Sequence, residues 1–210
     1  MIATDAKTIL GIAVAKDFAA VMQGKVAIAG EASYEAARQV FNGAVDRRPK
    51  LFTFCESARD VQEAVRAARA HGLPLSVRGG GHDWAGRALS HQGLVVDLSR
   101  MRQVEVDART QVATVAGGAR AIDVIAAAGP HGLAAVTGAS GTVGLAGLLT
   151  GGGYGPLLPR FGLALDNLLG AEIVLADGQI VFADSSQNSE LAVSCTALHV
   201  LRRERAALST

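Results

Sequence analysis

Residues 124–159 form a long segment in which no Asp, Glu, Lys or Arg occurs. The segment carries ten glycines and three prolines, so it cannot form the continuous apolar helix that spans a membrane. An uncharged segment of this length in a globular chain must be buried. It packs either into the core of the protein itself or around a large ligand.

A second glycine-rich feature lies upstream, where an apolar strand expected at Leu75–Val77 runs through Arg78 into Gly79-Gly80-Gly81 and His82. Consecutive glycines at the end of a strand leave backbone N–H groups with no side chain in front of them, as in a phosphate-binding loop. The alternative is an ordinary tight turn, because glycine is also the usual residue where φ is positive.

The uncharged segment contains its own glycine cluster, which runs from Thr137 through Gly144 and Gly147 to Gly151–Gly155. Within it, Val143–Thr150 can form one or two helical turns whose N-terminus would face an anion. Each glycine cluster can present backbone N–H groups to an anion. Two such groups of donors would suit a dinucleotide, because its pyrophosphate bridge is long and negatively charged. Neither cluster fits Gly-x-Gly-x-x-Gly, and no Gly-Lys-Ser or Gly-Lys-Thr occurs, which argues against nicotinamide-type and P-loop nucleotide sites.

Hydrophobic patterning predicts an α+β fold with two subdomains. In the first, strands at 51–55, 75–78 and 94–98 and a helix after Ser57 give a small parallel sheet. A further helix is expected at 33–41, ending at Asn42-Gly43. In the second, strands at 104–106 and 112–115 and a hairpin at 171–183 give antiparallel pairs, and a short helix around 122–126 ends at Gly129-Pro130.

The formal net charge of +1 gives no electrostatic reason to expect nucleic acid or an anionic membrane as a partner, so a small molecule is expected. Cys55 and Cys195 are too far apart in sequence to suggest a disulfide framework or a zinc site. Charged residues interrupt the apolar runs of Met1–Val21, so no secretion signal is expected and the chain is assigned to the cytoplasm. The basic cluster Arg202, Arg203 and Arg205 is interpreted as a solvated helix face or a tail.

Several motifs in this order resemble one known family, the FAD-linked oxidases of the vanillyl-alcohol oxidase and p-cresol methylhydroxylase (PCMH) type, and within it the berberine bridge enzyme-like subgroup. The similarity runs from Tyr34 to about Leu191. The motifs that carry it are Val77–His82, Val95–Ser99, Gly138–Gly155, Asp166–Leu169 and Ala176–Gly178.

The resemblance implies a PCMH-type FAD-binding domain at 45–191, with subdomains of about 45–100 and 101–191, an N-terminal segment at 1–44 and an atypical tail at 192–210. FAD is expected between the two subdomains, facing both glycine clusters. It implies no metal ligand and leaves the catalytic residue unknown. The cofactor-binding residues it implies are Val77, Arg78, Gly79, Gly80, Gly81, His82, Thr137, Gly138, Ser140, Thr142, Val143, Gly144, Gly147, Gly151, Gly152, Gly153, Tyr154, Gly155 and Val174.

For His82 the resemblance implies a covalent bond from the imidazole to the 8α-methyl carbon of the flavin. Members with two covalent bonds have a cysteine at the position of Ser140, and serine cannot form that thioether, so one bond at most is expected. His91, His131 and His199 are interpreted as exposed histidines.

The sequence departs from the family pattern after Leu191, where a substrate-binding domain would follow, so the chain is expected to be truncated. Two functions remain open. The first is an FAD-dependent oxidoreductase that takes hydride from a substrate C–H next to a hydroxyl or amine and passes electrons to molecular oxygen. The second is a remnant or subunit that binds FAD without turnover. In either case, self-association through exposed apolar surface is expected.

Overall fold

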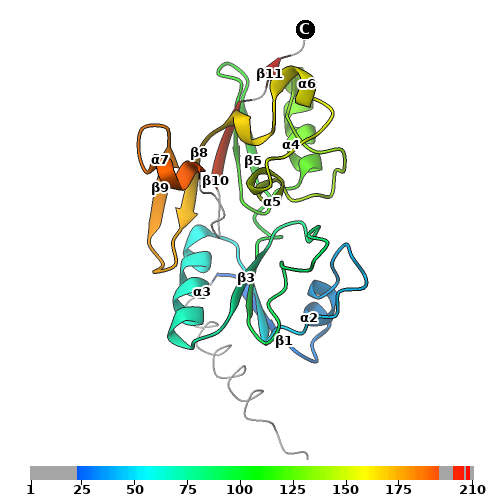
Figure 1. The fold of residues 1–210 in the computed structure, drawn as a ribbon, viewed down its shortest axis with the longest axis vertical. Coiled ribbons are helices and arrows are strands. Elements are labelled where there is room, and N and C mark those ends of the chain that lie inside the picture. The colour runs from blue at the N-terminus through cyan, green and yellow to red at the C-terminus, as the bar shows by residue number, and fades with distance from the viewer. Residues whose placement is uncertain (1–22, 194–200, 206, 209–210) are drawn as a thin grey trace, which may run out of the picture.

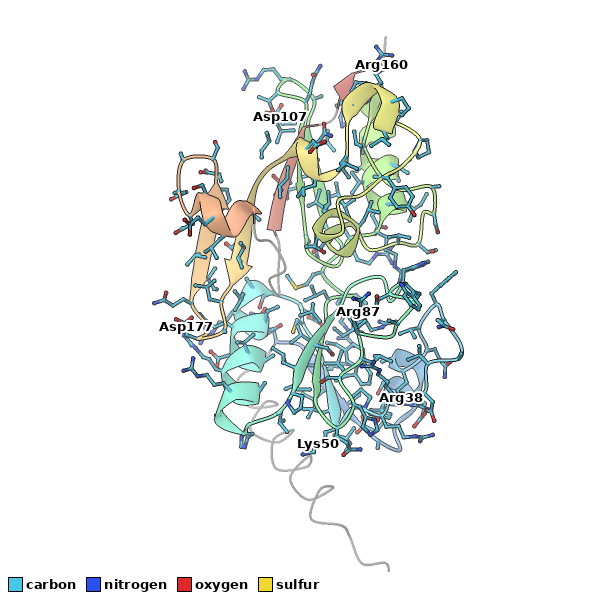
Figure 2. The ribbon with its side chains drawn as sticks, in the orientation of Figure 1. Arg38, Lys50, Arg87, Asp107, Arg160 and Asp177 are labelled. Atoms are coloured by element: carbon cyan, nitrogen blue, oxygen red, sulfur yellow. The ribbon has the colours of Figure 1, made fainter. Side chains whose placement is uncertain are left out.

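The computed structural model describes residues 23–193, 201–205 and 207–208, which form two lobes (Figure 1). One lobe holds a four-stranded sheet and the other a five-stranded sheet, with a short two-stranded pair beside it. Arg38 and Lys50 mark the first lobe in Figure 2, and Asp107 and Arg160 mark the second. The predicted α+β class with two subdomains is confirmed. The predictions for Met1–Val21, Cys195 and His199 concern positions outside the described residues.

The first sheet has the strand order β1-β2-β4-β3. Strands β2 (Leu51–Phe54), β4 (Leu94–Asp97) and β3 (Leu75–Arg78) are parallel to one another, as predicted. Strand β4 lies in the middle and all four of its residues are buried, because helices and loops cover both faces of a parallel sheet. Strand β1 (Lys25–Ile28) was not predicted and joins the edge in antiparallel orientation to β2.

Helix α3 (Ala58–Ala70) covers one face of this sheet. It begins at Ser57, whose hydroxyl accepts the backbone N–H of Asp60, an N-cap of the kind expected from the sequence. Val61, Ala64 and Val65 recur at helical spacing and are buried against the sheet. This packing fixes the strands whose ends carry the first glycine loop.

The opposite face of the sheet is covered by helix α2 (Ala32–Ala37) and the loop after β3. Tyr34 is buried here, and its hydroxyl donates to the carbonyl of Pro49 at 2.6 Å. The helix is shorter than predicted and ends at Ala37. The residues that follow turn instead toward the glycine loop, where the N–H of Phe41 donates to the carbonyl of Gly81 at 2.9 Å.

The second sheet has the strand order β5-β6-β10-β8-β9, and all its pairs are antiparallel. The predicted pairs are confirmed as the hairpins of β5 (Val104–Asp107) with β6 (Val112–Val115) and of β8 (Leu168–Val174) with β9 (Ile180–Asp184). The interpretation of the Arg202–Arg205 cluster as a helix face or tail was wrong. Leu201–Arg205 form strand β10, whose backbone pairs with β6 on one side and β8 on the other.

The uncharged segment packs largely into the second lobe. Val124 of helix α4 (Ala121–Ala128) and Leu145 and Leu149 of helix α5 (Leu145–Thr150) are buried with residues of β6 in one core cluster. The remaining short elements are η1 (Gly129–His131), β7 (Leu133–Ala134), α6 (Leu158–Phe161), η2 (Leu165–Asn167), α7 (Ser189–Val193) and β11 (Ala207–Leu208), which pairs with β7. Within the described ranges no helix has the length and apolar content needed to cross a membrane.

Candidate functional site: two glycine loops around His82

The two glycine clusters, far apart in sequence, meet at Gly80 and Gly144. A Cβ atom on Gly80 would collide with the backbone nitrogen of Gly144 and lie 2.8 Å from the carbonyl oxygen of Thr142. A Cβ on Gly144 would in turn collide with the backbone nitrogen of Gly80. Glycine is therefore required at both positions for the lobes to approach this closely.

Backbone donors remain available in both loops. Across the described part of the chain, the N–H groups of Gly79–His82 and of Ser140–Thr142 donate to no carbonyl or side chain. Clusters of free N–H groups beside small residues form concave sites for anions such as a pyrophosphate. That these two loops bind the phosphate bridge of a dinucleotide stays a prediction.

His82 lies at this junction and is held from two sides. Its Nε2 atom is 2.8 Å from Oγ1 of Thr142, and Oγ of Ser140 lies 3.2 Å from the same Thr142 atom. The ring of Phe41 stacks on the imidazole with the centroids 4.6 Å apart and an interplanar angle of 19°. The structure thus brings together His82, Ser140 and Thr142 from the predicted set, and adds Phe41.

The environment of His82 lowers the pKa of its imidazole. Burial disfavours the charged form, and the positive charge of Arg120, just before α4, acts in the same direction. A neutral imidazole keeps a lone pair on one ring nitrogen, which is the form that can act as a nucleophile.

Arg78 is the last residue of β3 and immediately precedes the first glycine loop, Gly79–His82. Its guanidinium donates to the fully buried carboxylate of Asp97 at 2.6 Å, and to the carbonyl of Gln39. Its Nε atom is buried without a partner among the described residues. The side chain of Val77 packs against the core of the first lobe. These two predicted residues therefore support the loop from within the protein.

The end of the second glycine cluster, Gly151–Gly155, packs against the start of that cluster and against Ala164. A Cβ on Gly155 would collide with the carbonyl of Thr137, and the carbonyl of Gly153 accepts the N–H of Ala164 at 2.8 Å. Tyr154, which lies between Gly153 and Gly155 in the sequence, is 77% exposed.

Other predicted residues make no hydrogen bond to the histidine. Among the described residues, no hydrogen bond joins Gly151–Gly155 or Gly147 to His82. Val174 is fully buried in the core of the first lobe, where β8 packs on α3. Gly138 lies beside Leu148, and Val143 donates its N–H to the carbonyl of Ser140.

Sequence reasoning missed two residues of the site, Phe41 and Arg120. Phe41 was assigned to a helix face, although an aromatic side chain next to Asn42-Gly43 would have fitted a loop equally well. Arg120 follows Ala119 and carried no distinguishing pattern. The described residues contain no cluster of His, Cys, Asp or Glu that could hold a metal ion.

Comparison with known proteins decides the family, because residues 49–184 match the family of the FAD binding domain. The chain belongs to this family of FAD-binding domains. The resemblance to the PCMH-type, berberine bridge enzyme-like oxidases is thereby confirmed.

Curated relatives and solved structures agree with this assignment. The FAD-binding domain is 39% identical over 170 residues to (R)-6-hydroxynicotine oxidase of Paenarthrobacter nicotinovorans, covering 81% of this chain and 37% of that protein. It superposes on the berberine bridge enzyme-like protein 1 of Physcomitrella patens with a TM-score of 0.87 and 28% identity, covering 92% of this chain and 44% of that one.

A third relative bears on the cofactor. The chain superposes on glucooligosaccharide oxidase of Acremonium strictum with a TM-score of 0.88 and 28% identity, over 93% of this chain and 42% of that one. That enzyme is described as carrying a 6-S-cysteinyl, 8α-N1-histidyl FAD. In all three comparisons the chain spans less than half the length of its relative.

Proposed function

We propose that the chain binds FAD at the paired glycine loops and forms the flavin-binding part of an oxidoreductase. The observation that carries this proposal is the junction of Gly80 with Gly144, which sets two rows of free N–H groups around His82. The loops would bind the pyrophosphate through these N–H groups. The imidazole of His82 would lie against the flavin edge.

When bound, the flavin supplies the redox chemistry: it accepts a hydride at N5 from a substrate C–H next to a hydroxyl or amine and passes the electrons to molecular oxygen. The residues of this chain bind and orient it. The ion pair of Arg78 with Asp97 stabilises the base of the first loop. The exposed ring of Phe41 covers one face of the His82 imidazole.

We further propose that FAD is attached covalently, through one bond, to His82. A ring nitrogen of His82 forms the bond to the 8α carbon as one C–H bond of that methyl group breaks. The methyl proton would go to water, and molecular oxygen would be the oxidant, taking up the two electrons and two protons to become hydrogen peroxide. Ser140 stands where a second bond would need a thiolate, since an alcohol is a far weaker nucleophile at neutral pH.

A second candidate function is FAD binding without substrate turnover by this chain alone, which would then need a separate substrate domain. The observation that favours it is the coverage of only 37% of (R)-6-hydroxynicotine oxidase. Substrate oxidation and FAD binding must therefore be measured separately.

The experiment is reconstitution of the purified chain with FAD, followed by acid denaturation and intact-mass measurement. We expect yellow precipitate and a mass equal to the protein plus one FAD. His82→Ala should still bind FAD when folded but release all of it on denaturation. His131→Ala, a change at an exposed histidine of η1, is the matched control and should retain the cofactor.

Three outcomes separate the proposals. A chain that remains colourless with excess FAD contradicts FAD binding. Flavin retained by denatured His82→Ala contradicts the assigned attachment residue. Yellow protein that consumes no oxygen with primary alcohols, amines or sugars as substrates supports the second candidate.

A further inference from the structure

The loop that carries His82 has little rigidity of its own. Gly79, Gly80 and Gly81 precede the histidine, and glycine loses more conformational freedom on folding than any other residue. Gly81 also has a φ of +70°. Contacts from outside the loop are therefore needed to hold it in the conformation found here.

The segment 39–42, which follows α2, lies along this loop and supplies such contacts. The N–H of Phe41 donates to the carbonyl of Gly81 at 2.9 Å. The side-chain Nδ2 of Asn42 donates to the carbonyl of Trp84 at 2.8 Å. Because residues 81 and 84 lie on either side of His82 in the sequence, these two hydrogen bonds bracket the histidine.

The ring of Phe41 adds a contact to the histidine itself. It stacks on the imidazole of His82 with the centroids 4.6 Å apart and an interplanar angle of 19°. Phe41 remains 73% exposed, so burial in a core does not explain its position. The hydrogen bond between Nε2 and Thr142 holds one ring atom and leaves the ring free to tilt about it, and a stacked neighbour restricts that tilt.

Asn42 is held in place by a turn of its own. Its Oδ1 atom accepts the N–H of Ala44 at 3.1 Å, and its carbonyl accepts the N–H of Val45 at 3.0 Å. Both ends of the side-chain amide are therefore used, the oxygen within the turn and the nitrogen toward Trp84. An aspartate has the same shape but no donor, so Asn42→Asp keeps the turn and breaks the bond to Trp84.

We propose that Phe41 and Asn42 are positioning residues of the cofactor site, which hold the loop 81–84 and the His82 imidazole in place before a ligand binds. The inference rests on the proposed binding of FAD at this loop. A loop that is held in advance loses less conformational freedom on binding, so the affinity for the ligand is higher. Both residues precede residue 49, where the match to the FAD binding domain begins, so the cofactor site extends upstream of the matched region.

The first test needs no cofactor and measures opening of the loop by limited digestion with trypsin. Arg87 is exposed and lies three residues beyond Trp84, so cleavage after it reports local opening of this region. We expect this cleavage to be about threefold to tenfold faster in Asn42→Asp and in Phe41→Leu, the range for one hydrogen bond or one aromatic pair. Cleavage after Arg109, between β5 and β6, is the internal reference. An equal acceleration at Arg109 would show a loss of the whole fold and would contradict the proposal.

Three further variants serve as controls. Gly43→Asp adds the same charge as Asn42→Asp at an exposed position where a Cβ would meet nothing within 4 Å. Phe182→Leu removes an exposed phenylalanine from β9. Both should be cleaved at the wild-type rate, and Phe41→Tyr, which keeps an aromatic ring, should be as well. A wild-type rate in either Asn42→Asp or Phe41→Leu would overturn the role of that residue.

The second test connects the loop to the cofactor. The dissociation constant of FAD is measured by quenching of flavin fluorescence in a His82→Ala background, where no attachment to His82 contributes. Asn42→Asp should raise this constant about threefold to tenfold, because a smaller fraction of the chain has the loop in place, and Gly43→Asp should leave it unchanged. An unchanged constant in Asn42→Asp, with a loop that trypsin finds more open, would disprove the link to cofactor binding. If the wild-type chain binds no FAD, the proposed function fails, whereas the trypsin rates still decide whether Phe41 and Asn42 hold the loop.

Discussion

Gly80 and Gly147 belong to the same candidate site but have opposite surroundings. Gly80 faces the backbone of Thr142 and Gly144, whereas a Cβ on Gly147 would meet nothing within 4 Å. Both residues are glycines in glycine-rich runs, so the sequence pattern alone does not distinguish them. The role of each glycine depends on what lies in front of its Cα atom.

We therefore expect opposite effects from the same substitution. Gly80→Ala should lower the free energy of unfolding by about 1–3 kcal/mol, because rigid backbone must move to admit the methyl group. Gly147→Ala, in helix α5, should leave it unchanged or raise it by up to about 1 kcal/mol. Urea unfolding of both variants measures this, and equal effects would contradict the close approach of the loops.

The pKa of His82 predicts how stability depends on pH. Burial and Arg120 lower this pKa in the folded chain, so the unfolded chain binds more protons as the pH falls below about 6.5. The contribution of His82 to the free energy of unfolding is therefore complete above that pH and is lost as the pH falls through the window between the unfolded and folded pKa values. His82→Gln should remove this part of the acid sensitivity.

Arg120→Gln tests the second cause of the shift. An NMR titration of His82 should show a higher pKa in this variant, because one positive charge is removed. Arg160→Gln, a change at the far end of the second lobe (Figure 2), is the matched control and should give the wild-type value. A pKa unaffected by Arg120→Gln would leave burial as the sole cause.

At the scale of elements, strands β3 and β4 end together at the ion pair of Arg78 with Asp97. The Asp97 carboxylate also accepts the N–H of Ser99 at 2.8 Å, and the Arg78 guanidinium reaches Gln39. This buried pair connects two strand ends, the segment after α2 and the base of the glycine loop. We infer that it holds the loop in one conformation.

Removal of one partner should be costly. Asp97→Ala leaves a largely buried guanidinium unpaired, and we expect a loss of about 3–5 kcal/mol in the free energy of unfolding. Glu63→Ala breaks the exposed pair of Glu63 with Arg66 on α3 and should cost less than about 1 kcal/mol. Thermal and urea unfolding compare them. Similar losses in the two variants would show that the Arg78 pair is not a special support.

Local patterns in the sequence predicted the elements that depend on local contacts. The amphipathic spacing of α3 and the Asp177-Gly178 turn between β8 and β9 are properties of short segments, and the structure confirms them. Strands β1 and β10 were missed because their partners lie far away in sequence. Arg202–Arg205 show no apolar alternation, and pairing on both sides by β6 and β8 determines their conformation.

The candidate site was predicted only in part for a related reason. Runs of glycine are visible in a sequence, and they indicated both loops. The stacking of Phe41 on His82 and the effect of the Arg120 charge on the pKa of His82 arise when separate segments come together, so no local pattern encodes them.

At the scale of the whole molecule, the second lobe exposes large apolar side chains on several elements, α4 and β9 among them. Ile122 and Ile125 lie three residues apart on α4 and are 49% and 44% exposed, and Ile180 and Phe182 share one face of β9. Ile122 also lies beside Gly141, next to the Ser140–Thr142 loop. Apolar surface beside a binding site is a common site of association.

We expect the isolated chain to self-associate through the α4 surface. Ile122→Gln combined with Ile125→Gln should shift the chain toward monomer, because it removes the apolar contact. Ile180→Gln combined with Phe182→Gln is the matched control on β9 and should have a smaller effect. Sedimentation velocity measures the outcome, and a wild-type chain that is monomeric at all concentrations would contradict the expectation.

The position of β10 in the second sheet has a consequence for biosynthesis. A ribosome releases β5 and β6 first and the β8–β9 hairpin later, but the strand that joins them comes only at 201–205 (Figure 1). Until then the two hairpins have no backbone connection within the sheet, while the first lobe already has all its strands. The first lobe can therefore fold during translation, and the second sheet closes only after residue 205 has left the exit tunnel.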